Sequence, residues 1–244
     1  MTERATFVLV HGAFRAGWSF ARLRPLLEAQ GHRTFAPSLP GFGEHRATTV
    51  KDVSLAQWAE STARFIELED LSRVILVGHS QGGLVIAAAS QLCHARLSRL
   101  VFLDAPIARH GERAIDLQPK ALQGMTPPAL ARDLWLPPKP MSASETLSAE
   151  DAAWINPRLG PTPIGPSLDP LVLEHPAALV LPRHHLFCRA TPETFPCAHG
   201  RERLLREGTP FSSIEADHDA PITAPALVAD ALLAIARGEA TPHA

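Results

Sequence analysis

Cysteine is scarce in this sequence. The three cysteines, Cys93, Cys188 and Cys197, are odd in number and form no C-x-x-C pair. A disulfide framework or a zinc site is therefore not expected, and we predict free or buried thiols. Histidine is more frequent, but the twelve histidines are scattered along the chain. We expect the protein to need no metal and no other cofactor.

The sequence also has no large excess of positive or negative charge and no long apolar run. The 23 Lys and Arg residues nearly balance the 25 Asp and Glu residues, which gives a formal net charge of −2. This balance argues against nucleic acid or an anionic membrane as a partner. No apolar run approaches the ~20 residues that a membrane span needs. Met1–Arg4 lead directly into an apolar stretch and leave no room for a signal peptide, so we expect a cytoplasmic protein.

Apolar strand-like runs alternate with helix-like segments along most of the 244 residues. The length suits one large domain with a small insertion. The alternation predicts the α/β class, with a mostly parallel, doubly wound sheet and helices on both of its faces. The expected strands cover 5–10, 32–37, 73–77, 97–103, 184–189 and 211–216. The expected helices cover 18–30, 54–68, 81–93, 197–206 and 225–237.

The pattern changes between residues 106 and 182, where proline-rich joints separate expected helices over 128–135 and 148–156. Such a segment is not expected to form a regular sheet. We predict a core of 1–105 and 183–244, with 106–182 inserted as a small Pro-rich lid. Several apolar residues that so small a lid cannot bury alone are candidates for the roof of a substrate pocket. They are Met125, Leu134, Trp135, Trp154 and Ile155.

Residues 78–82 read Gly-His-Ser-Gln-Gly, directly after one expected strand and before an Ala-rich helix. This is the G-x-S-x-G pattern of a nucleophile elbow in the strand-to-helix setting that the motif requires. The turn is sharp, and Gly78 and Gly82 provide the room that it needs. Ser80 is therefore the expected nucleophile. The N–H of Gln81, at the start of the helix, is expected to face the negative charge that develops on a substrate.

Two further parts of the chain complete the expected site. Gly12 permits a sharp turn after strand 5–10, which would free the N–H of Ala13 as a second oxyanion donor. Gly12 and Phe14 are expected substrate contacts. His218 follows the last expected strand, as the order serine, acid, histidine requires, and it is the expected base. All these residues follow apolar strands, whose carboxyl ends meet at one edge of the sheet.

Together these pieces resemble the α/β-hydrolase superfamily, and more closely its methylesterase and hydroxynitrile-lyase-like branch. The resemblance spans nearly the whole chain and implies Ser80 as nucleophile and His218 as base. It also implies Ala13 and Gln81 as backbone donors. The matching stretches are 7–13, 26–32, 78–83 and 217–225, with a weaker match at 151–154.

The identity of the acid is the open point. Many relatives carry it just after the strand matched by 186–190, where this sequence has Thr191, and Glu193 is the only carboxylate nearby. Asp104 follows the preceding core strand, where some hydrolases of the superfamily place their acid. We favour Asp104 because a strand end is more rigid than a loop between prolines.

The sequence therefore predicts a serine hydrolase that cleaves a carboxylic ester, thioester or lactone of a small, largely apolar substrate through an acyl-enzyme. A cyanohydrin lyase of this branch is expected to carry a threonine and a lysine where this chain has Gly12 and Asp219, and the negative charge of Asp219 would repel cyanide, so lyase activity is disfavoured. Non-hydrolytic alternatives are a lyase or cyclase and a ligand-binding sensor on the same scaffold. The expected partner is a small-molecule substrate, with a homodimer as a further option.

Overall fold

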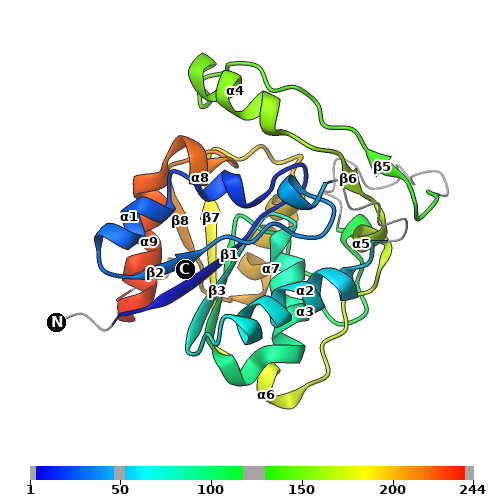
Figure 1. The fold of residues 1–244 in the computed structure, drawn as a ribbon, viewed down its shortest axis with the longest axis vertical. Coiled ribbons are helices and arrows are strands. Elements are labelled where there is room, and N and C mark those ends of the chain that lie inside the picture. The colour runs from blue at the N-terminus through cyan, green and yellow to red at the C-terminus, as the bar shows by residue number, and fades with distance from the viewer. Residues whose placement is uncertain (1–3, 47–52, 118–129, 240–244) are drawn as a thin grey trace.

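The computed structural model describes residues 4–46, 53–117 and 130–239 (Figure 1). Within these residues the centre is a six-stranded sheet in the order β2-β1-β3-β4-β7-β8. Every neighbouring pair in it is parallel. The predicted mostly parallel, doubly wound sheet is thus confirmed. Its strands are β1 (Thr6–Val10), β2 (Arg33–Phe35), β3 (Val74–His79), β4 (Leu97–Leu103), β7 (Arg183–Cys188) and β8 (Ser212–Ile214).

Helices cover both faces of this sheet, because alternate side chains of each strand point to opposite faces and both sets are apolar. On one face, Val8, Leu76 and Leu100 pack against α2 (Leu55–Leu68) and α3 (Gly82–Cys93). On the other, Leu9 and Val101 pack against α1 and α9, which appear in blue and red in Figure 1. The bounds of the helices that complete the two layers are α1 (Arg24–Ala29), α7 (Pro196–Glu207) and α9 (Pro225–Arg237).

Local sequence explains where the helices begin. Ser54 caps α2 with a complete capping box, since its hydroxyl accepts from Gln57 N–H and the Gln57 side chain accepts from Ser54 N–H. The expected helix 18–30 is instead divided. A 3-10 helix covers Gly17–Phe20, and α1 begins only at Arg24, with Pro25 in its first turn. Proline suits that place because its missing N–H would have no partner there.

The chain between β4 and β7, residues 106–182, is called the insertion segment below. Figure 1 shows its α4 (Ala149–Ile155) and β5 (Trp135–Leu136) lying apart from the central sheet. The expected helix over 128–135 is wrong for its described residues, since β5 pairs antiparallel with β6 (Thr162–Pro163). Leu136 precedes Pro137, which disfavours helical backbone and promotes extended backbone. Met125, one of the expected roof residues, lies outside the described residues.

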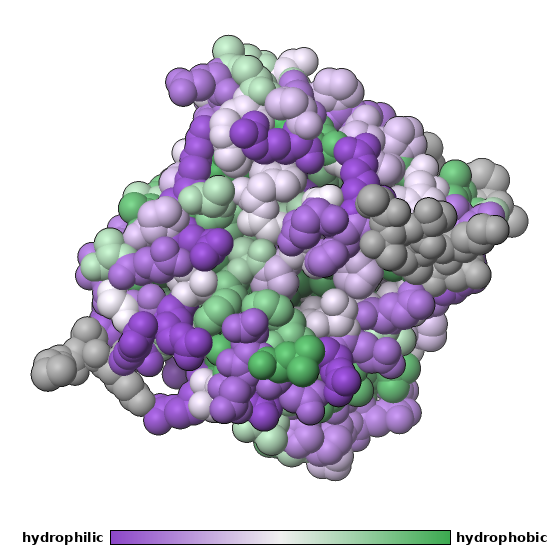
Figure 2. Space-filling view, in the orientation of Figure 1, coloured by the Kyte–Doolittle hydropathy of each residue, from purple (hydrophilic) through white to green (hydrophobic). Residues whose placement is uncertain are grey.

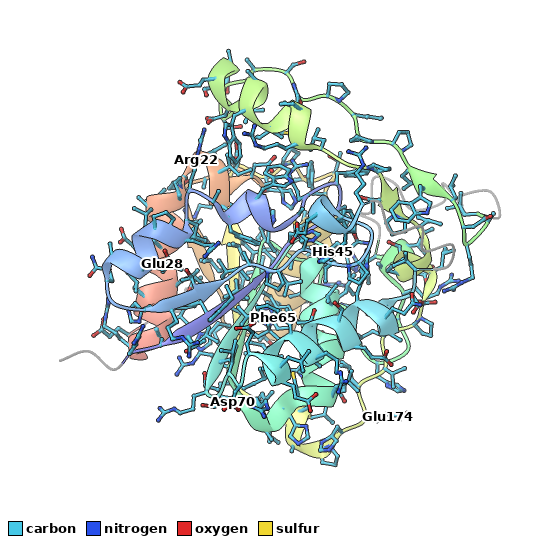
Figure 3. All side chains as sticks on the ribbon, in the orientation of Figure 1. Arg22, Glu28, His45, Phe65, Asp70 and Glu174 are labelled. Atoms are coloured by element: carbon cyan, nitrogen blue, oxygen red, sulfur yellow. The ribbon has the colours of Figure 1, made fainter. Side chains whose placement is uncertain are left out.

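Contacts with the core hold α4 in place. Asp151 of α4 forms an ion pair with Arg22, which lies beneath this helix in Figure 3. Trp154 packs edge-on against Trp18, with ring centroids 5.5 Å apart. Shorter helices complete the described structure: α5 (Gly165–Leu168), α6 (Pro176–Leu179), α8 (Ala220–Thr223) and 3-10 turns at Gly43–His45, His94–Arg96, Ala114–Asp116 and Asn156–Arg158.

The described surface shows no separation into a polar half and an apolar half in the view of Figure 2. On the face drawn in Figure 2, hydrophilic residues are interspersed with hydrophobic ones. In the part of the chain that the structure describes, no helix combines the length and the apolar character needed to cross a membrane.

Candidate functional site

Ser80 lies on the turn between β3 and α3, as the motif predicts. Its φ of 52° is in the left-handed region, which a non-glycine residue adopts only at some cost. A Cβ on Gly78 would overlap the carbonyl of Gly82, and a Cβ on Gly82 would overlap the carbonyl of Val10. Both positions therefore need glycine, because the backbone packs too closely before and after the serine to leave room for a side chain.

We expect Gly82→Ala to lower the free energy of unfolding by about 3 kcal/mol, because a rigid backbone carbonyl blocks the added methyl group. Gly160→Ala is the matched control, since a Cβ there meets open space and Gly160 has no positive φ. Denaturant unfolding of both variants checks the expectation. Equal stability of the two would contradict the close packing described for the elbow.

The structure brings Ser80, His218 and Asp104 together at the carboxyl edge of the sheet. Ser80 Oγ lies 3.0 Å from His218 Nε2. His218 Nδ1 lies 2.7 Å from Asp104 Oδ2. These are hydrogen-bond distances, so a proton can pass from the serine to the imidazole while the carboxylate orients the ring.

Asp104 is 1% exposed and immediately follows β4. Its carboxylate accepts hydrogen bonds from Thr191 Oγ1 at 2.6 Å and from the N–H of Cys188 at 3.1 Å. Burial alone would raise the pKa of Asp104. The hydrogen bond and charge of His218, with the other two donors, outweigh burial and hold this pKa below its usual value. Glu193, the alternative acid, is an exposed residue that makes no described contact with His218.

The ring of His218 is fixed by neighbours on two sides. Phe195 packs against it with a centroid separation of 4.7 Å. His79 lies behind it, with centroids 4.9 Å apart, and its Nε2 is 2.7 Å from the carbonyl oxygen of His218. A carbonyl can only accept, so Nε2 of His79 carries the proton. Burial and the neighbouring His218 lower the pKa of His79 to about 4, which keeps it neutral.

Residues 11–14, which contain the predicted oxyanion donor Ala13 and are called the oxyanion loop below, follow β1 and approach Ser80. A Cβ on Gly12 would lie 2.7 Å from Ser80 Cβ, so only glycine leaves space for the hydroxyl. His11 supports this loop, because its Nδ1 lies 2.9 Å from Gly12 O and its Nε2 accepts from Leu39 N–H. In the described structure the N–H groups of Ala13 and Gln81 donate to no protein acceptor. Both residues line the cavity above Ser80, where their N–H groups remain available to a ligand.

The insertion segment is bound to the oxyanion loop. Phe14 N–H donates to Thr162 Oγ1 at 2.6 Å, and Gly160 N–H donates to Phe14 O at 3.2 Å. Phe14 has a positive φ of 61°, and these two bonds hold its backbone in that conformation. The position of the predicted donor Ala13 thus depends on β6 and on the residues before it.

Comparison with known proteins gives the family. A family model described as Alpha/beta hydrolase family matches residues 7–231. The chain belongs to this family. A carbendazim hydrolyzing esterase from Nocardioides sp. (strain SG-4G) is 39% identical over 118 residues, which cover 48% of this chain and 49% of that protein. Methylesterase 2 of Arabidopsis thaliana is 36% identical over 125 residues, covering 50% of this chain and 47% of that protein.

The chain thus spans about half the length of these curated relatives. A solved structure of an extracellular alpha/beta-hydrolase from a Paenibacillus species covers more. It is 25% identical, has a TM-score of 0.74 and covers 95% of this chain and 98% of its own. It is described as sharing structural and functional homology with tobacco Salicylic Acid Binding Protein 2. The resemblance to the methylesterase-like branch of the alpha/beta hydrolases is confirmed.

A cavity of about 710 Å³ lies above Ser80 in this alpha/beta hydrolase. Ala13, Gln81 and His218 line its floor with Ser80, and the insertion segment supplies much of the rest. Most of the lining that the insertion segment contributes is apolar. The sequence alone did not identify these lining residues, because they lie in irregular, proline-rich chain. The lining residues contributed by the insertion segment include Ala114, Ile115, Leu136, Pro137, Pro138, Met141, Leu159 and Ile164.

Of the predicted substrate contacts, Phe14 lines this cavity, whereas Trp135 and Trp154 do not. Gly12, the remaining predicted contact, is also absent from the lining, so a substrate role for these three residues stays a prediction. The Trp135 ring packs against Gly41, whose missing side chain makes room for it. Trp154 is occupied by Trp18 and by two guanidinium groups, including that of Arg158 at 4.3 Å from the ring centroid. Leu134 and Ile155 are likewise absent from the lining.

An ion pair at Asp219, the residue after His218, could not be found from the sequence. Arg15 donates to both carboxylate oxygens of Asp219, at 2.8 and 3.0 Å, although the two residues are 204 positions apart. Their side chains are 12% and 8% exposed. Burial raises the pKa of Asp219, but Arg15 and His218 lower it more, so the group stays ionised. The negative charge that the sequence places after His218 is therefore balanced by a guanidinium.

One cluster has the residue types of a metal site. Donor atoms of Asp104, Cys197 and His218 lie within 4.8 Å of one another. Burial and the nearby Asp104 raise the pKa of the Cys197 thiol, which disfavours the thiolate that a metal prefers. The other two atoms are engaged in hydrogen bonds to each other. Cys93 and Cys188 are also buried with raised pKa, and all three cysteines are free, as predicted.

Proposed function

We propose that this protein is a serine hydrolase that cleaves a carboxylic ester, thioester or lactone through an acyl-enzyme. The observation that carries the proposal is the hydrogen-bonded chain from Ser80 through His218 to Asp104 at the floor of an apolar cavity. Relatives of this chain are named esterase and methylesterase, which supports the same reaction class.

In the proposed mechanism, Ser80 Oγ attacks the acyl carbonyl while its proton moves to His218 Nε2. The carbonyl oxygen becomes an oxyanion, which the N–H groups of Ala13 and Gln81 stabilise. Asp104 holds His218 in the tautomer that accepts this proton and stabilises the resulting cation. His218 then gives the proton to the leaving alcohol. Water repeats these steps on the acyl-enzyme and releases the acid and free Ser80.

The cavity supports a substrate with an apolar acyl or alcohol portion. Its lining is mainly aliphatic and aromatic, with Leu136, Leu159 and Ile164 opposite the polar groups of the floor. Burying such a portion contributes to binding by removing apolar area from water. We propose that the insertion segment acts as the lid of this cavity, on the core formed by 1–105 and 183–244.

Hydrolysis of p-nitrophenyl esters with acyl chains of two to eight carbons tests this function. We expect turnover that improves with chain length, because longer chains bury more apolar area. We also expect a fluorophosphonate probe to label the native protein at Ser80 in equimolar amount, and heat-unfolded protein not at all. A native protein that neither hydrolyses these esters nor reacts with the probe would contradict the proposal.

A further inference from the structure

A second cavity, of about 630 Å³, lies on the α2/α3 face of the sheet, over β4 and β7. In doubly wound sheets a helix usually covers the crossover between neighbouring parallel strands. Here the connection from β4 to β7 is the insertion segment. Its last helix before β7, α6, has only four residues and lies at the edge of the molecule in Figure 1. The surface between α3 and α7 is therefore left hollow.

The interior of this second cavity is mostly apolar. Phe102 of β4 and His185 of β7 are partners in the strand register, and their rings stack with centroids 4.9 Å apart. Leu84 of α3 and Leu204 of α7 form opposite walls, and Leu171 of the insertion segment adds to the lining. Burial and nearby cations lower the pKa of His185 to about 4, so its ring is neutral at pH 7.

Two guanidinium groups also line the second cavity. Arg109 is paired with Glu207. Arg183, at the start of β7, has no acidic partner among the described residues. Arg183 is an exposed residue, but partial burial and the charge of Arg109 lower its pKa, as expected for a cation with a second cation nearby. The lining thus carries two arginines against one carboxylate.

We infer that the second cavity is a binding site for an amphipathic carboxylate, with its alkyl chain over Phe102 and Leu84 and its carboxylate on the guanidinium of Arg183. The planar guanidinium binds a carboxylate through two parallel hydrogen bonds. A neutral apolar molecule would fill the same space but leave Arg183 uncompensated, and a cation would be repelled. Leu84 and Pro106 line both cavities, so the two sites share a wall but use different polar groups.

Calorimetric titration with decanoate tests this site without any use of Ser80 chemistry, so the result is independent of the proposed hydrolase. We expect decanoate to bind the wild type. Decan-1-ol, which lacks the charge, should bind at least about tenfold more weakly. Arg183→Gln should weaken decanoate binding by about tenfold or more. Arg33→Gln is the matched control, since Arg33 is also an exposed first residue of a strand, and it should change binding less than about twofold.

The place of binding is checked separately. A crystal grown with 10-bromodecanoate should show bromine beside Phe102 and the carboxylate at Arg183. Ala108→Trp, which fills the cavity from a partly exposed loop position, should abolish decanoate binding while thermal unfolding shows an intact fold. Absence of decanoate binding, equal binding of decan-1-ol, an unaffected Arg183→Gln variant, or bromine only above Ser80 would each overturn the assignment.

Discussion

Ser80→Ala is expected to lower kcat/KM for p-nitrophenyl ester hydrolysis by about 10⁴-fold or more. The substitution removes the atom that forms the acyl bond and leaves the oxyanion donors and the cavity unchanged. Substrate binding does not depend on the hydroxyl, so the loss should lie in kcat and not in binding of the ester. Steady-state kinetics with an active-site titration of the wild type measures kcat/KM and kcat. The variant should also lose fluorophosphonate labelling.

Ser167→Ala is the matched control for this experiment. Ser167 lines the same cavity, and its hydroxyl accepts a hydrogen bond from Gln81 Nε2 at 2.9 Å. It makes no described contact with His218, so we expect its removal to change kcat/KM less than about tenfold. If Ser80→Ala retained the wild-type rate, Ser80 would not be the nucleophile. If Ser167→Ala lost as much activity, the loss in Ser80→Ala would not be specific to the Ser80 hydroxyl.

Asp104→Asn is expected to lower kcat by about 10⁴-fold. An amide at this position can present an N–H toward His218 Nδ1, which then must accept, and the tautomer that removes the serine proton is lost. Glu193→Gln should leave kcat within about twofold of the wild type, since Glu193 is exposed and makes no described contact with Ser80, His218 or Asp104. Stopped-flow measurement of the acyl-enzyme burst separates this effect on acylation from later steps.

A second readout of Asp104→Asn is the pH dependence of unfolding. The pKa of Asp104 is lower in the folded protein than its usual 3.8. Its ionised form therefore stabilises the fold at pH values above the unfolded pKa, and this contribution disappears as pH falls through the folded pKa. The Asn variant should lack this part of the acid dependence.

In the kinetic experiment, a large loss of kcat in Glu193→Gln with a normal kcat in Asp104→Asn would transfer the role of the acid to Glu193.

Local patterns explain what could be predicted from the sequence. The elbow at Ser80 follows from residues adjacent in the chain, and the parallel sheet follows from alternating strands and helices. Since parallel strands end at one edge, the meeting of Ser80 with His218 could be expected as well. The acid was harder, because Asp104 and Glu193 both follow neighbouring strands. Only the path of the loop after β7 decides between them, and Thr191 on that loop now donates to Asp104.

Contacts between distant, irregular segments could not be predicted. The pairing of Arg15 with Asp219 has no sequence signature, because ion pairs depend on where loops lie in space. The positions of Trp135 and Trp154 outside the cavity lining could not be predicted for a related reason. An apolar residue in the insertion segment can face the cavity or the core, and without regular secondary structure no periodicity indicates which. The prolines after Trp135 signalled the end of a helix, but not the two-residue ladder that replaced it.

Because all three native thiols are buried, we expect thiol reagents to leave the wild-type chain unlabelled, which suits site-directed labelling. Maleimides react with thiolates, and a raised pKa keeps Cys93, Cys188 and Cys197 protonated at neutral pH. In an Ala153→Cys variant, with the new thiol at an exposed position of α4, residue 153 would then be the only site that a maleimide fluorophore labels. Changes in the surroundings of α4 could then be followed in solution from that one dye, without first replacing a native cysteine.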